Sequence, residues 1–134
     1  MVTERLPDWE TRLAHYMASA RDQLDDGVGG PTRTSYCALY AAGAAEAMTG
    51  ENPSKPFRGR FAEVAKDLEA TIAGVFAEVH PALAQRGDWA WHEGVVGVVM
   101  GDVAYFIGEQ PAGTPILVPV PRADWAKAWA IGRG

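Results

Sequence analysis

The chain has 134 residues, of which 48% are hydrophobic and 22% charged, and we expect one globular domain spanning residues 1–134. The net charge of −5 and the scattered Lys and Arg residues argue against nucleic acid as the main partner. One cysteine rules out an intramolecular disulfide, and no run approaches the roughly 20 apolar residues of a membrane span. The N-terminus has no apolar signal region, so we expect synthesis in a cytoplasm without a signal peptide.

The first half of the chain predicts helices. Apolar residues at helical spacing predict a helix from Pro7 to about Gln23. A second helix is expected to begin at an N-cap on Thr34 or Ser35, to run to about Met48 and to end at Thr49-Gly50. Its many alanines let neighbours approach closely, so we expect a buried central helix.

The segment from Arg58 to about Val79 predicts a helix in two pieces, with an interruption near residues 69–74 and an end at His80-Pro81. Beyond it, β-rich runs alternate with Gly and Pro. The predicted strands are Trp89–Trp91, Val95–Met100, Val103–Ile107 and Ile116–Val120, with a hairpin turn at Gly101-Asp102 and a short helix over Ala123–Trp129.

This order of elements indicates an α+β fold. N-terminal helices, including the Ala-rich one, are expected to pack on a C-terminal antiparallel sheet of about 4–6 strands.

Cys37, the only cysteine, stands near the start of the predicted Ala-rich helix. A helix N-terminus lowers a thiol pKa, and its free N–H groups can face an oxyanion. Cys37 is therefore a candidate catalytic nucleophile. The alternative is a small buried residue on the inner helix face, in line with Ala41 and Ala44.

Three histidines are available as a base. His92 is the candidate, just before the glycine turn at Gly94, and its alternative role is an exposed loop residue. His15 is expected at the polar edge of the first helix, and His80 as a helix terminator. No Cys/His pair has metal-ligand spacing, so we expect neither a metal nor a cofactor.

Four tryptophans form two spaced pairs, one on a predicted strand and one at i, i+4 spacing. They are Trp89, Trp91, Trp125 and Trp129. We expect core or interface aromatics, with a glycan-stacking platform as the second interpretation.

Together, Cys37 at the start of an Ala-rich helix, the Gly87-Asp88 strand and the Val96-Gly97-Val98 strand resemble the NlpC-like peptidases of the papain-like cysteine hydrolases. The string Cys37–Gly50 resembles more closely a small phage and prophage group related to them. The resemblance implies a papain-like fold, a Cys37 nucleophile and genes that sit among tail genes.

The chain departs from the family pattern at three positions. Tyr36 stands where the family has aspartate, Ser35 where the phage group often has histidine, and Val95 where active peptidases place the catalytic histidine. A general base contributes about 10²–10⁴-fold to a rate. Val95 therefore favours a domain that is not an enzyme.

The resemblance thus implies a structural or docking component of a phage tail tip, located in the virion, with other tail proteins as partners. One alternative is an active peptidoglycan endopeptidase or amidase that assists DNA entry, with Cys37 as nucleophile and His92 as base. A second is a prophage-encoded host-interaction protein.

Overall fold

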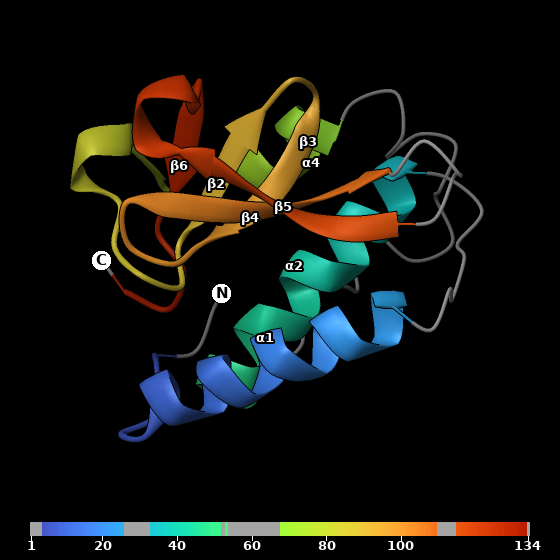
Figure 1. The fold of residues 1–134 in the computed structure, drawn as a ribbon. Coiled ribbons are helices and arrows are strands. Elements are labelled where there is room, and N and C mark those ends of the chain that lie inside the picture. The colour runs from blue at the N-terminus through green and yellow to red at the C-terminus, as the bar shows by residue number, and fades with distance from the viewer. Residues whose placement is uncertain (1–3, 26–32, 52, 54–67, 110–114, 134) are drawn as a thin grey trace.

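The computed structural model describes residues 4–25, 33–51, 53, 68–109 and 115–133. Figure 1 shows the two N-terminal helices lying together on one side of a sheet that is built from the second half of the chain. The helices are α1 (Trp9–Asp25), α2 (Arg33–Thr49) and α4 (Leu68–Ala73). The strands are β1 (Glu78–Val79), β2 (Trp89–His92), β3 (Val95–Val99), β4 (Val103–Glu109), β5 (Pro115–Pro121) and β6 (Lys127–Trp129), with 3₁₀ turns η2 (Pro81–Leu83) and η3 (Arg122–Asp124).

The strands form one six-stranded sheet in the order β1-β6-β2-β3-β4-β5, and every described pair of neighbours is antiparallel. The α+β architecture with a C-terminal antiparallel sheet is therefore confirmed. None of the described helices is long and apolar enough to cross a membrane.

The last strand corrects the expectation of a helix over Ala123–Trp129. The i, i+4 spacing of two tryptophans suggested a helix, but this segment forms η3 followed by β6. Trp129 pairs with Trp89 and Ala128 with Ala90, so β6 inserts between β1 and β2. Pairing with a distant strand outweighed the local helical pattern.

The predicted helix interruption near residues 69–74 is also wrong. Residues Leu68–Ala73 form α4, because Leu68 and Ile72 are spaced to bury one face. His80 is likewise no helix terminator, since its Nδ1 caps η2 by accepting from the Ala82 N–H at 3.0 Å. The expected helix over residues 58–67 lies outside the described residues.

Helix α2 is buried as its composition predicted. Ala41, Ala44, Ala45 and Met48 have no exposed surface, and α1 lies alongside α2 (Figure 1). The Tyr16 hydroxyl donates to the Tyr40 carbonyl at 2.7 Å and lies directly against Gly43, which leaves no room for a side chain there. Small residues thus allow close helix packing.

Candidate functional site

The β2–β3 hairpin holds the position where the resemblance places a catalytic histidine. Glu93 and Gly94 form its turn with φ angles of 48° and 80°, as a type I′ turn requires. This turn sets His92 directly opposite Val95. Val95 is only 4% exposed, and it is part of the core. An apolar side chain therefore fills the expected base position.

His92 shares a sheet face with Val95, because directly opposed residues of antiparallel strands point the same way. Its Nδ1 lies 3.0 Å from the Asp124 backbone oxygen, and its ring packs 5.8 Å from Phe106. A carbonyl oxygen only accepts, so this bond requires the proton on Nδ1 and leaves the Nε2 lone pair available. His92 is not the loop residue of the alternative interpretation but a partly buried, oriented strand residue.

The oriented imidazole meets one requirement for a general base, a third group that fixes the ring. The Glu93 carboxylate, which is largely exposed, lies 3.8 Å from Nε2. Sequence reasoning did not identify the Asp124 carbonyl as the group that orients His92, since it lies 32 residues away.

Cys37 is the fifth residue of α2, since the helix begins at Arg33. The predicted N-cap at Thr34 or Ser35 is therefore wrong, because both residues lie inside the helix. Only the first four N–H groups of a helix lack helical acceptors, so the Cys37 N–H is not one of the free donors. The Cys37 side chain lies outside the described part of the structure.

Three of the four tryptophans are core residues rather than surface anchors. Trp89 and Trp129 have no exposed surface, and Trp125 is 5% exposed with its Nε1 donating to the Val120 oxygen at 3.0 Å. Trp91 is partly exposed and packs edge-on against Trp129, 5.9 Å between ring centroids. Of these four tryptophans, only Trp91 therefore retains surface for contact with a partner or a glycan.

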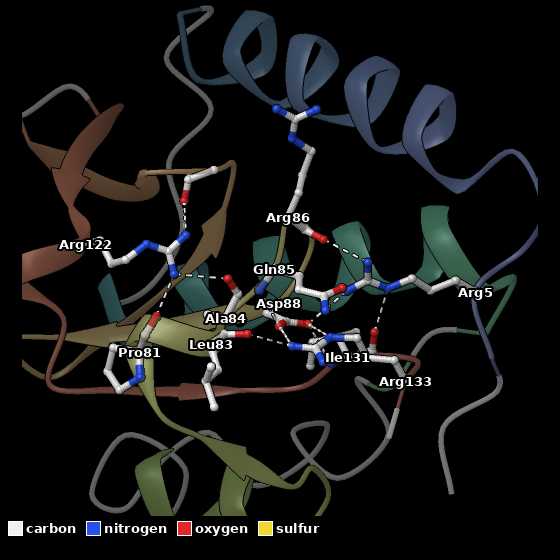
Figure 2. Close-up of polar contacts among 11 residues, drawn as sticks. Arg5, Pro81, Leu83, Ala84, Gln85, Arg86, Asp88, Arg122, Ile131 and Arg133 are labelled. Carbon is white, nitrogen blue, oxygen red and sulfur yellow. Dashed lines mark hydrogen bonds and ion pairs between the residues drawn. The ribbon is translucent and has the colours of Figure 1, made fainter.

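The Gly87-Asp88 motif contributes a buried carboxylate at the centre of a polar cluster (Figure 2). Asp88 has no exposed surface. Its Oδ1 accepts from Arg5 Nη2 at 2.9 Å, from the Ile131 N–H at 3.1 Å and from Arg133 Nε at 3.2 Å. Its Oδ2 accepts from the Gln85 N–H at 2.8 Å and also from Arg133 Nη2.

This cluster joins both ends of the described chain to β2. Arg5 also donates to the carbonyls of Ile131 and Arg86, each at 2.8 Å. Burial lowers the pKa of Arg5, and the Asp88 charge opposes that shift. Because five N–H groups donate to the Asp88 carboxylate, this side chain holds several separate segments of the fold together. The motif was visible in the sequence, but its two arginine partners were not.

Arg122 is the centre of a second group of polar contacts, which surround η2 (Figure 2). Its Nη1 donates to the carbonyls of Pro81 and Ala84 at 2.6 and 3.0 Å, and its Nη2 donates to Gly101 at 2.7 Å. The guanidinium also stacks on Trp125, 4.8 Å from the ring. These bonds fix η2 against the β3–β4 turn.

No group of three or more His, Cys, Asp and Glu side chains that could hold a metal gathers among the described residues. In the described part of the site, the oriented imidazole of His92 thus lies opposite the apolar Val95. The contacts around Asp88 and around Arg122 hold the surrounding loops.

Comparison with known proteins gives one match. Residues 4–131 match a family described as a domain of unknown function, DUF6950. No curated protein and no solved structure matches the chain. Since the match covers nearly all of the sequence, the chain belongs to the DUF6950 family.

Proposed function

We propose that this protein is a structural or docking component of the tail tip of a tailed phage or phage-like particle, built on a papain-like, NlpC-like framework without the usual catalytic base. The observation that carries the proposal is Val95, apolar and 4% exposed at the position of the expected histidine. The Ala-rich α2, the Gly87-Asp88 motif and the β2–β3 hairpin follow one another in the order that the resemblance implies.

Docking would place the protein in the virion, next to other tail proteins. The buried tryptophans are unsuitable as anchors, so a docking surface must use other residues. Asp88 and Arg122 bind the backbone of the loops beside them and so hold these loops in place. Loops that are already ordered lose less entropy when a partner binds, which suits a docking surface.

Two measurements test this function. Purified particles from a producing host should contain the protein, detected by mass spectrometry at a constant ratio to other tail proteins. Purified protein should release no muropeptides from peptidoglycan sacculi. Turnover that Cys37→Ala abolishes would overturn the docking-only role, and absence from purified particles would favour the prophage host-interaction alternative.

One observation favours a second function, a peptidoglycan endopeptidase or amidase. His92 lies directly opposite Val95, and its Nδ1 is held by the Asp124 carbonyl. In this reaction the Cys37 thiol would give its proton to Nε2 and attack the scissile carbonyl. The protonated imidazole would return the proton to the leaving amine, and water would then hydrolyse the thioester.

The enzyme hypothesis requires a pattern of three variants in the muropeptide assay. Cys37→Ala and His92→Ala would each abolish release, whereas His15→Ala, at an exposed position on α1, would leave it unchanged. Release that survives His92→Ala would exclude His92 as the base.

A further inference from the structure

A groove is formed where several distant parts of the chain meet. Its volume of about 930 Å³ is that of a site for a small organic ligand. The N-terminal segment and the residues after α4 supply its apolar walls, which include Leu6, Trp9, Val75 and Phe76. The C-terminal segment and the turn before β2 add polar side chains to these walls.

Two cations at this groove share a single buried carboxylate. Arg5 and Arg133 both line the groove, and both bind Asp88, which has no exposed surface. Burial lowers the pKa of Arg5, the Asp88 charge raises it, and the charge of Arg133 lowers it again. Two positive charges against one negative charge leave a surplus of one positive charge in this cluster. A bound anion would neutralise it.

Arg133 also has a nitrogen that is free to donate. Its Nε and Nη2 bind Asp88, and Nη2 donates to the Leu83 carbonyl as well. Because a guanidinium is planar, the third nitrogen, Nη1, lies on the opposite edge of the group. No described residue accepts a hydrogen bond from Nη1, and the Arg133 side chain is 27% exposed. Arg133 can therefore bind a second acceptor at the groove.

Gln85 adds a second polar group to the groove, and Figure 2 shows it with Arg5 and Arg133 around Asp88. The Gln85 backbone N–H binds Asp88, whereas its side-chain amide forms no hydrogen bond with the described residues. Glu4 lines the groove too, but it is exposed and forms no ion pair with the described residues. Glu4 therefore leaves the surplus positive charge unpaired, and it disfavours a ligand with more than one negative charge.

From these groups we infer that the groove binds a small organic carboxylate with an apolar body, of the size of an N-acylated amino acid. The ligand carboxylate accepts from Arg133 Nη1 and from the Gln85 amide, and the apolar body lies against Trp9 and Phe76. A carboxylate supplies the one negative charge that the arginine cluster lacks, and hydrogen bonds between oppositely charged groups are stronger than neutral ones. The inference does not depend on the proposed function.

Titration of the purified chain with N-acetyl-phenylalanine tests the site, with the indole N–H signals followed in proton–nitrogen correlation spectra. The Trp9 signal should shift, because this ring lines the groove and lies 4.3 Å from the Arg5 guanidinium. The Trp125 signal should stay in place, since its Nε1 donates to the Val120 oxygen and Trp125 does not line the groove. N-acetyl-phenylalaninamide, which has no charge, should bind at least about tenfold more weakly.

Two variants test the groups that hold the carboxylate. Gln85→Ala removes the side-chain amide and keeps the backbone N–H that binds Asp88, so the acid should bind about threefold or more weakly in a chain that folds normally. Arg133→Lys keeps the charge but lacks Nη1, and it should lose most of the preference for the acid over the amide. Circular dichroism and the Tm of each variant check that folding is unchanged.

Glu4→Gln gives a change in the opposite direction. It removes a negative charge from the groove and should strengthen binding of the acid about twofold to fivefold at low salt. Asp102→Asn is the matched control, because it removes a fully exposed carboxylate outside the groove and should leave the affinity unchanged. Equal binding of acid and amide, or a Trp9 signal that does not move at about 10 mM acid, would overturn the site. So would an affinity that neither Gln85→Ala nor Glu4→Gln changes, whatever the particle and muropeptide assays show.

Discussion

Arg5 and Asp88 are 83 positions apart in the sequence and form an ion pair in the folded chain, with Arg5 Nη2 2.9 Å from Asp88 Oδ1. The carboxylate has no exposed surface, and the Arg5 side chain is only 8% exposed. The same carboxylate binds Arg133, so the two terminal segments of the described chain meet at one buried negative charge.

The first prediction concerns this charge. Asp88→Asn leaves two arginines without their carboxylate and should lower the free energy of unfolding by about 3–5 kcal/mol. Urea denaturation followed by circular dichroism measures the change. The control is Asp102→Asn, because Asp102 is fully exposed and 3.8 Å from Arg122 Nε, and its loss should cost less than about 0.5 kcal/mol. Similar losses in both variants would contradict the role of Asp88.

Arg122 provides the second prediction. Arg122→Lys keeps the charge but lacks the planar fork that binds three carbonyls, so unfolding free energy should fall by about 2 kcal/mol. Arg12→Lys is the matched control, since Arg12 makes an exposed i, i+4 pair with Asp8 and its replacement should be nearly neutral. Hydrogen exchange at Leu83 and Ala84 should rise in Arg122→Lys, and unchanged exchange there would show that Arg122 does not fix the loop.

Gly97 provides the third prediction. A Cβ at this position would lie 2.6 Å from the Phe106 ring, which packs over the glycine. Gly97→Ala should therefore destabilise the domain by about 1–3 kcal/mol through overpacking. Gly74→Ala is the control, because a Cβ there would meet only ordinary contacts at 3.5 Å. Thermal unfolding of both variants would show a lower Tm for Gly97→Ala alone.

The fourth prediction is a pH dependence. Burial raises the pKa of Tyr16 to about 12 from an ordinary value of 10.0, with a further contribution from the Glu46 charge. Below pH 10 the phenol is protonated in both the folded and the unfolded chain. Between pH 10 and about 12 only the unfolded chain ionises, so stability falls with rising pH by up to about 1.4 kcal/mol per pH unit.

Tyr16→Phe isolates this effect. The variant loses the hydrogen bond to the Tyr40 carbonyl and should be less stable than the parent at pH 8 by about 1 kcal/mol. The difference should shrink as the pH rises above 10, because only the parent has the Tyr16 phenol to ionise. A difference that stays constant in urea titrations from pH 8 to 11 would contradict the raised pKa of Tyr16.

The local features of the fold could be predicted from the sequence. Leu13 and Met17 lie in the predicted apolar stripe of the first helix, and both are buried in α1. The Met100 N–H donates to the Val103 oxygen at 2.9 Å across the predicted turn at Gly101-Asp102. Such features depend on neighbours a few residues apart, which the sequence displays directly.

The candidate site was predicted only in part. Cys37, His92 and Val95 could be selected by residue type and by resemblance, but the pairing of His92 with Val95 depends on the register of a hairpin. The bond from His92 to the Asp124 carbonyl depends on the return of the chain through η3. The burial of Trp89 and Trp129 follows from β6, which local spacing had predicted as a helix.

The sequence by itself determined the α+β order of elements, the buried Ala-rich helix and the absence of a histidine at position 95. Only the tertiary structure decided that Arg5, Asp88 and Arg133 share one buried charge, and that the N-terminal segment, the residues after α4 and the C-terminal segment line one groove. The physical reason is that periodicity and turn chemistry act within a few residues. Ion pairs and grooves are made by side chains that only folding brings together.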